Sequence, residues 1–163
     1  MKALYIHGFQ STPVKTKIDI LKKYFDGVIA PLIDWEDKED RVNLFQDLSK
    51  IIEKQGITHI IGSSMGGQMA FFLSTYLNKN GLCFNPAFGH VYNDFEFRIN
   101  KDFTGKILID LGKSDDIVSP AETVKFIQNS VFNDDDIYIE YLNIGHTIDT
   151  DTFENAVIKL ISL

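Results

Sequence analysis

The 163-residue chain is 44% hydrophobic and 24% charged, a length and composition that predict one globular domain over residues 1–163. Its formal net charge of −7 disfavours a nucleic acid or an anionic membrane as partner, because the chain carries no basic field that would release counterions. One cysteine, Cys83, excludes an internal disulfide and indicates the reducing cytoplasm, and no hydrophobic run has the length of a signal peptide or a transmembrane segment.

The first part of the chain alternates short hydrophobic segments with segments of helical spacing. We expect strands over residues 2–6, 27–30 and 58–61. Pro13 opens a first helix, and a second helix carries a hydrophobic stripe that Gly56 closes. This stripe consists of Val42, Phe45, Leu48, Ile51 and Ile52. The charged stretch 34–41 between these helices is predicted to be a loop or first helical turn with a solvated face.

The third strand leads into the most informative segment, Gly62-Ser63-Ser64-Met65-Gly66. A serine at the apex of a strand–turn–helix is typical of a nucleophile elbow. Its backbone is forced toward positive φ, at a cost of roughly 1–3 kcal/mol for a residue other than glycine. The strand and the helix nearly touch at such a turn, and Gly62, Gly66 and Gly67 leave the space that this approach needs.

The rest of the chain continues the alternation. A helix follows the elbow, and strands are expected over residues 81–84, 106–111 and 137–142. Ser119 as N-cap, Pro120 in first position and Glu122 are expected to form a capping box that opens another helix. The last helix is expected to carry the hydrophobic residues Phe153, Ala156, Val157, Leu160 and Ile161. Together these elements predict an α/β fold in three layers, α/β/α, with a mostly parallel sheet of about six strands.

The candidate catalytic residues all follow strands. Ser64 follows the third strand, Asp115 the fifth and His146 the sixth, while His7-Gly8-Phe9 follows the first. The carboxyl ends of parallel strands meet at one edge of the sheet, where ligands bind. The order Ser, Asp, His along the chain is that of the α/β-hydrolases.

Each of these residues has a chemical role and an alternative. Ser64 is the predicted nucleophile, and His146 is the predicted general base rather than a loop histidine without a role. Asp115 is predicted to orient His146, favoured over Asp116 by the pattern Gly-x-x-Asp-x-x-Val. Asp110 lies within a strand and is interpreted as a structural hydrogen-bonding residue.

The oxyanion hole is expected to use the backbone N–H groups of Phe9 and Met65. His7 either shapes the loop that carries Phe9 or acts as a second base. Among the many phenylalanines, most of which belong to the core, three are candidates for an acyl pocket: Phe88, Phe95 and Phe97.

Particular residues argue against other kinds of functional site. Gly62 and Gly67 have the spacing of a phosphate-binding P-loop, but Gln68 stands where that motif requires lysine. The four histidines and Cys83 have no metal-ligand spacing, and His59 is interpreted as structural.

The chain resembles the α/β-hydrolase superfamily, and within it the small bacterial YqiA-type esterases. Residues 5–13 are similar to that group's opening H-G-F-x-S-x-P, and Lys17 also fits it. Residues 62–67 are similar to its elbow, and Asn85-Pro86-Ala87 resembles its N-P-A after the fourth strand. The resemblance runs the whole length of the chain and implies hydrolysis of carboxylic esters or thioesters without a cofactor or a metal.

Two departures from that group concern the surroundings of the site. The segment between Ala87 and Lys106 is short, which predicts little or no cap and an open, shallow site for short-chain acyl esters. Gly145 precedes the histidine where the group has asparagine, a difference expected to touch only loop conformation.

These observations predict a cytoplasmic serine hydrolase that cleaves small-molecule acyl esters or thioesters through Ser64, His146 and Asp115. No nucleic-acid or membrane partner is expected, and the residues do not specify an oligomeric state. Two alternatives stay open: a binding or scaffolding module with a vestigial site, and a hydrolase of another bond such as an amide or a C–C bond.

Overall fold

The computed structural model describes residues 1–36, 41–90, 100, 102–129 and 136–163. In this part of the chain six strands form one sheet in the order β2-β1-β3-β4-β5-β6, and every neighbouring pair is parallel. The strands are β1 (Lys2–Ile6), β2 (Gly27–Ile29), β3 (His59–Ser63), β4 (Asn80–Phe84), β5 (Ile107–Gly112) and β6 (Ile137–Leu142). The helices are α1 (Lys15–Tyr24), α2 (Arg41–Gln55), α3 (Met65–Leu77), α4 (Pro120–Gln128) and α5 (Thr150–Ser162), with a short 3₁₀ turn η2 (Phe88–His90).

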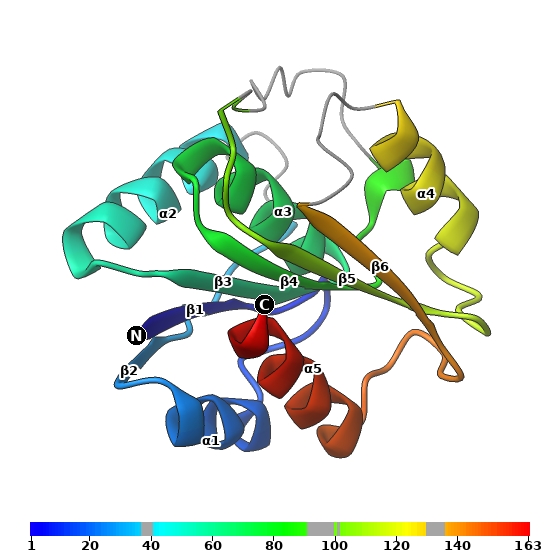
Figure 1. Cartoon of the computed structure of the whole chain (residues 1–163), viewed down its shortest axis with the longest axis horizontal. Coiled ribbons are helices and arrows are strands. Elements are labelled where there is room, and N and C mark those ends of the chain that lie inside the picture. The colour runs from blue at the N-terminus through cyan, green and yellow to red at the C-terminus, as the bar shows by residue number, and fades with distance from the viewer. Residues whose placement is uncertain (37–40, 91–99, 101, 130–135) are drawn as a thin grey trace.

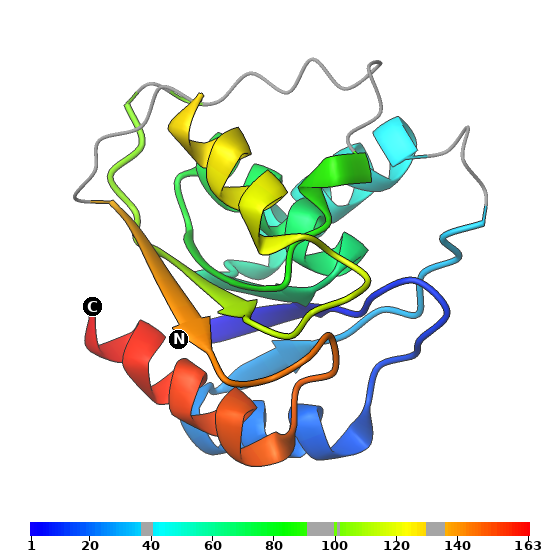
Figure 2. The same cartoon turned by 90° about the vertical axis from the view of Figure 1, so that its right-hand side faces the viewer.

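Helices cover both faces of the sheet, as Figures 1 and 2 show. Helices α1 and α5 pack together on one face, and α2, α3 and α4 lie on the other. Each face has its own hydrophobic core, one including Phe71 of α3 and the other including Phe153 of α5. The predicted three-layer α/β architecture is therefore confirmed, with a sheet that is parallel throughout its described strands.

Several element boundaries differ from the sequence-based expectation. Helix α1 begins at Lys15 rather than Pro13, since the chain is still extended at Val14. Strand β3 runs two residues past the expected end, and its ladder pairs Ser63 with Phe84 of β4. Helix α4 begins as expected, with Ser119 as its N-cap residue and Pro120 in first position. The expected capping box is wrong, because the Ser119 side chain makes no capping hydrogen bond.

The hydrophobic stripe expected on α2 is confirmed at Phe45, Leu48 and Ile52 and is wrong at Val42. Arg41, Phe45, Leu48 and Ile52 are buried at spacings of four, three and four residues, whereas Val42 is 45% exposed. The predicted solvated face of the stretch 34–41 is therefore wrong at Arg41, which is only 7% exposed. It is wrong at Trp35 as well, which is buried at 5% exposure.

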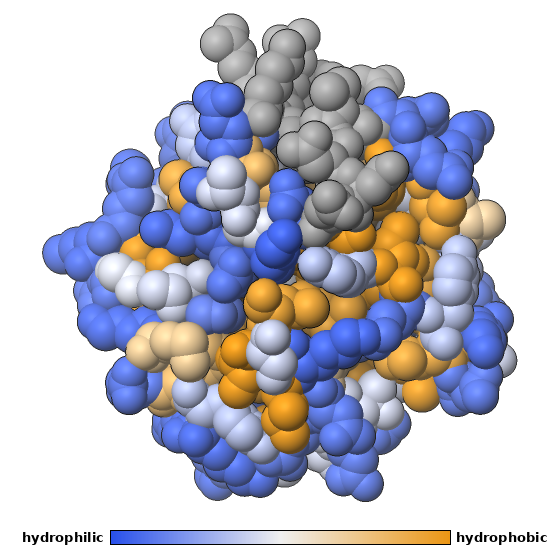
Figure 3. Space-filling view, viewed as in Figure 1, coloured by the Kyte–Doolittle hydropathy of each residue, from blue (hydrophilic) through white to orange (hydrophobic). Residues whose placement is uncertain are grey.

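Strand β6 lies at one edge of the sheet. Five of its residues are half-buried and Tyr141 is exposed, unlike the fully buried residues of β5. Figure 3 accordingly shows hydrophobic side chains, in orange, reaching the surface near this edge among the polar side chains that cover most of the face.

The turn from β3 into α3 leaves no room for side chains on two glycines. A Cβ added to Gly62 would lie 2.1 Å from Gly66 O, and one added to Gly66 would lie 2.2 Å from Ile6 O. Ser64 at the apex has φ 55° and ψ −120°, the strained conformation expected of a nucleophile elbow. The sharp turn is thus built from close backbone contact on both sides of one strained serine.

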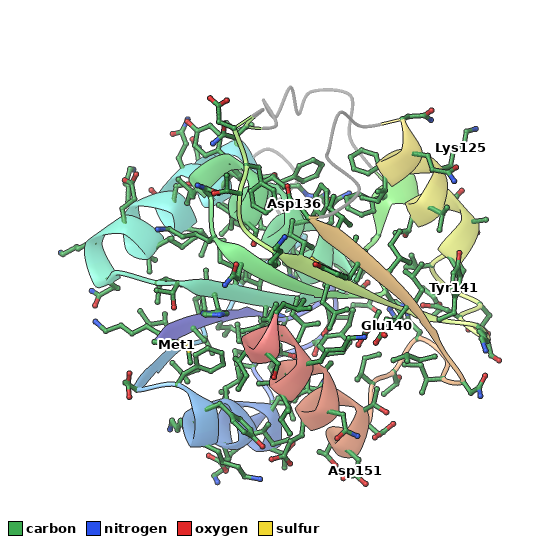
Figure 4. All side chains as sticks on the ribbon, in the orientation of Figure 1. Met1, Lys125, Asp136, Glu140, Tyr141 and Asp151 are labelled. Carbon is green, nitrogen blue, oxygen red and sulfur yellow. The ribbon has the colours of Figure 1, made fainter. Side chains whose placement is uncertain are left out.

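Asp110 lies in the middle of β5 and is 1% exposed. The expectation that it serves as a hydrogen-bonding residue is wrong for Oδ1, which is buried without a hydrogen-bond partner among the described residues. Its cross-strand neighbour Glu140 points to the α5 side of β6 in Figure 4, where it pairs with Lys159. Burial, with a smaller contribution from Glu140, raises the pKa of Asp110 to about 7.

The strain at Ser64 predicts the effect of a glycine substitution on stability. Ser64→Gly should raise the free energy of unfolding by about 1 kcal/mol, because glycine adopts positive φ without strain. Chemical denaturation measures the change. Ser63→Gly is the matched control, since Ser63 is not among the residues with positive φ and glycine there should only weaken β3. A lower free energy of unfolding for Ser64→Gly than for the wild type would contradict the strained geometry.

The raised pKa of Asp110 predicts a pH-dependent stability. The native state holds a proton that the unfolded chain, with its model value of 3.8, releases, so stability should fall as pH rises from about 4 to about 7. Asp110→Asn removes this pH dependence. The free energy of unfolding of the variant, relative to that of the wild type, should therefore increase between pH 4.5 and pH 8, by a few kcal/mol at most. Urea unfolding at the two pH values measures the gain. The exposed Asp116→Asn should show no such gain, and an equal difference at both pH values for Asp110→Asn would contradict the prediction.

Candidate active site

A cavity of about 520 Å³ opens at the carboxyl ends of the strands. Ser64 and Met65 from the elbow, His146 from the loop after β6, and Phe9 from the loop after β1 all line it. Its remaining wall consists of Gln10, Trp35, Glu36, Arg41, Ala87, Ile117 and Val118. Four of the five residues singled out from the sequence thus share one cavity of a size typical for small ligands.

The fifth of these residues, Asp115, lies behind His146. Its Oδ2 is 2.8 Å from His146 Nδ1, and its side chain is fully buried, whereas the His146 side chain is 21% exposed. The N–H groups of Ile117 and Val118 donate to Asp115 Oδ1 at 2.9 and 2.8 Å. Because an ionised carboxylate only accepts, Nδ1 carries the proton, and the lone pair of His146 is on Nε2. The neighbouring Asp116 is exposed instead.

The elbow is anchored to the end of β4. Ser64 N–H donates to Phe84 O at 2.8 Å, and Ser64 O accepts from the N–H groups of Gln68 and Ala87 at 3.0 and 3.2 Å. Met65 is the first residue of α3, so its N–H group has no partner within the helix. The serine is therefore held through its backbone, while its side chain lines the cavity.

The loop after β1 passes close to the elbow at Gly8. A Cβ on Gly8 would lie 3.1 Å from Ser63 O and 3.2 Å from Ser64 Cβ, distances tighter than ordinary van der Waals contact. Glycine therefore allows the loop to pack directly against Ser64, which brings Phe9 to the edge of the cavity.

His7 shapes this loop from the inside. The buried imidazole donates from Nδ1 to Gly8 O at 2.9 Å and accepts at Nε2 from Ile33 N–H at 2.9 Å. The indole Nε1 of Trp35 donates to His7 O at 3.1 Å. Both ring nitrogens are occupied, so of the two roles considered from the sequence, shaping the loop is the one that the structure supports.

Asn85 holds the His146 loop in place, a role that sequence reasoning missed. Its side-chain amide donates to the carbonyl oxygens of Gly145 and His146, both at 3.1 Å, and its carbonyl accepts from Gly112 N–H at 2.7 Å. Its φ is 44°, a conformation that asparagine tolerates better than most residues. The one signal in the sequence is an asparagine directly after a strand, since asparagine tolerates positive φ.

The cavity wall contains hydrophobic residues other than those expected. Phe88 lies in the core at 4% exposure, stacked on Phe126 with ring centroids 4.1 Å apart, so its assignment to an acyl pocket is wrong. Phe95 and Phe97 lie outside the described residues, as does much of the segment predicted to form little or no cap. Trp35, Ile117 and Val118 supply the hydrophobic wall instead.

His59 lies away from the cavity. His59 begins β3 at the opposite end of the strand from the elbow, where it interacts with Thr58 Oγ1 and Asn80 Nδ2 at 2.8 and 3.3 Å. Burial lowers its pKa to about 4.

Within the described ranges, no cluster of three or more histidine, cysteine or acidic side chains is arranged to hold a metal ion. None of the helices described is both long and hydrophobic enough to cross a membrane.

Known structures resemble this fold closely. A protein assigned to the alpha/beta hydrolase superfamily, from Xanthomonas campestris pv. campestris, has a TM-score of 0.75 and 17% identity over 99% of this chain and 98% of its own. Esterase PE8 has a TM-score of 0.64 and 16% identity, with coverage of 99% and 91%. FphF, a fluorophosphonate-binding serine hydrolase of Staphylococcus aureus, has a TM-score of 0.65 and 16% identity, with coverage of 99% and 82%. The chain therefore has the α/β-hydrolase fold.

Sequence comparison gives the family. No curated protein matches the chain. The family model of the uncharacterised protein family UPF0227 matches residues 2–106, a range that contains the loop after β1, the elbow and Asn85-Pro86-Ala87. Since this match spans more than half of the sequence, the chain belongs to UPF0227, the family that includes the YqiA-like esterases.

Proposed function

We propose that this protein is a serine hydrolase that cleaves small or short-chain carboxylic esters or thioesters, with Ser64 as nucleophile, His146 as general base and Asp115 as the residue that orients His146. One observation carries the proposal: His146, hydrogen-bonded through Nδ1 to the buried Asp115, lines the same cavity as the strained Ser64. The three residues follow three different strands, and the specific pairing of His146 with Asp115 beside Ser64 goes beyond the common edge that the parallel sheet gives all its strand ends.

The chemistry follows from this arrangement. A serine hydroxyl is a weak nucleophile near neutral pH and needs an adjacent base. His146 Nε2 accepts the Ser64 proton as Oγ attacks the substrate carbonyl, and the same proton then goes to the departing alcohol or thiol. Water repeats the sequence on the acyl-enzyme. Asp115 stabilises the imidazolium formed in each step, and its second oxygen is already occupied by two backbone donors.

The backbone N–H groups of Phe9 and Met65 are the proposed oxyanion hole. Met65 follows the nucleophile at the start of α3, and Gly8 brings Phe9 against Ser64. Donors of this kind contribute about 3 kcal/mol each to transition-state stabilisation. The contacts of His7 with Gly8 and Ile33 support this part of the proposal, because they hold the Phe9 loop in one conformation.

The cavity of about 520 Å³ that Ser64 and His146 line is the proposed acyl site. Trp35, Ala87 and Val118 give it a mostly hydrophobic wall, and about 520 Å³ suits a short acyl chain. The names of esterase PE8 and of the serine hydrolase FphF, which share the fold, agree with ester cleavage.

The nucleophile is tested with p-nitrophenyl acetate and p-nitrophenyl butyrate. Ser64→Ala should lower kcat by about 10⁴ or more, because the acyl-enzyme can no longer form. A fluorophosphonate probe should label the wild type and not the variant. A folded wild type that neither turns over these esters nor reacts with the probe would contradict the proposal and favour a binding module.

The hydrogen bonds from Asn85 to the His146 loop predict a loss of activity that can be separated from a loss of stability. Asn85→Gly keeps the positive φ but removes the bonds to the His146 loop, and should lower kcat by about tenfold or more. Asn78→Gly is the matched control: Asn78 also has positive φ, at 55°, and its side chain accepts from the N–H groups of Thr104 and Gly105, away from the cavity.

Ester hydrolysis and chemical denaturation of the two variants provide the comparison. Both should be less stable than the wild type by about 1–3 kcal/mol, and only Asn85→Gly should lose activity. Equal activity in both variants would mean that Asn85 does not position His146.

A further inference from the structure

A second, smaller cavity reaches Ser64 and His146. Its volume is about 230 Å³, and Tyr5, Ser63 and Lys17 form part of its wall. Tyr5 and Ile148 belong to the core under α1 and α5, whereas Trp35 in the larger cavity belongs to the core on the other face of the sheet. The two cavities therefore extend from the same reacting residues toward opposite faces of the sheet, whose helices Figure 2 shows.

Lys17 brings a positive charge into the smaller cavity. It is half-buried on α1, and its ammonium lies 5.3 Å from the centre of the Phe153 ring. It forms neither an ion pair nor a hydrogen bond with any described residue, unlike Lys15 on the same helix, which pairs with Asp19 at 2.6 Å. Burial lowers the pKa of Lys17, although the nearby Asp149 opposes this effect.

Asp149 does not neutralise Lys17 directly. Its two carboxylate oxygens accept from the backbone N–H and the hydroxyl of Thr152, each at 2.8 Å, and so cap the start of α5. The carboxylate attracts Lys17 from a distance while its own hydrogen bonds are made elsewhere. The ammonium group of Lys17 therefore has N–H donors available for another hydrogen-bond partner.

Two hydroxyl groups add polarity beside this charge. Ser63 Oγ is buried and has no hydrogen-bond partner among the described residues. The phenol of Tyr5 is buried as well, and burial raises the pKa of Tyr5 although the neighbouring Ser63 hydroxyl opposes this effect. A buried hydroxyl without a partner is unfavourable and is satisfied by an acceptor group on a ligand.

We propose that the smaller cavity binds the alcohol or thiol part of the substrate through an anionic group, such as a carboxylate, and that Lys17 determines this specificity. The inference rests on the proposed function. Because the larger cavity is mostly hydrophobic and suits the acyl chain, the polar cavity on the other side of Ser64 and His146 receives the part that leaves. A half-buried cation without an ion pair at this position favours an anion over a neutral group.

The test compares two butyrate esters that differ in one charge: those of 4-hydroxybenzoate and of its methyl ester. After correction for their rates with hydroxide, the wild type should have a kcat/KM at least about tenfold higher for the anionic ester. Lys17→Met should remove this preference, chiefly through KM, and leave the neutral ester within about twofold. Lys15→Met is the matched control and should keep the wild-type preference.

Every outcome bears on the proposal. A wild type without preference for the anionic ester, or an equal loss on both esters in Lys17→Met, overturns the role of Lys17. If a folded wild type cleaves neither ester, the proposed function fails. Calorimetric titration of the wild type and of Lys17→Met with 4-hydroxybenzoate then tests separately whether the smaller cavity binds an anion. Binding that depends on Lys17 supports the anion site, and its absence overturns it.

Discussion

The end of β3 and the start of α3 share a space that admits only backbone. A Cβ on Gly62 would approach Gly66 O to 2.1 Å, and one on Gly66 would approach Ile6 O to 2.2 Å. The end of β1, the end of β3 and the start of α3 can therefore lie in contact only because these two residues have no side chain. This contact forces Ser64 to positive φ and turns its side chain toward the cavity. It also lets the end of β1 lie against the elbow, which brings the Phe9 loop to the same place. The strain is tolerated because both backbone groups of Ser64 are hydrogen-bonded, the N–H group to Phe84 at the end of β4 and the carbonyl oxygen to Gln68 and Ala87.

The remaining parts of the site reach this turn from distant segments, and each is held by a buried polar side chain. His7 ties the Phe9 loop to the segment after β2 through Ile33, and Asn85 ties the His146 loop to β5 through Gly112. Asp115 divides its two oxygens between His146 and the backbone of its own loop. All three side chains are buried with their hydrogen bonds made, which favours one arrangement over many.

Much of this could be predicted from the sequence, because the alternation of strands and helices fixes where strand ends meet. Ser64, His146 and Phe9 follow strands, and the structure brings all three to one cavity. The burial of Arg41 could not be predicted, since it depends on how α2 is rotated against the sheet rather than on the charges around it. The role of Asn85 was hidden for a similar reason: its partners are carbonyl groups about sixty residues away, and backbone groups carry no sequence signal. The missing partner of Asp110 Oδ1 could not be predicted either, because the residue type does not show which groups lie within hydrogen-bonding distance.

The tether at Asn85 has a consequence for how this family can vary. Asn85 recognises the carbonyl oxygens of Gly145 and His146, and every amino acid supplies such an oxygen. A Cβ on Gly145 would meet nothing closer than Ser114 O at 3.6 Å, an ordinary contact. The residue before the histidine can therefore change while the loop keeps its path. Substitutions at position 145 offer a route to reshaping the approach to the cavity without disturbing the imidazole.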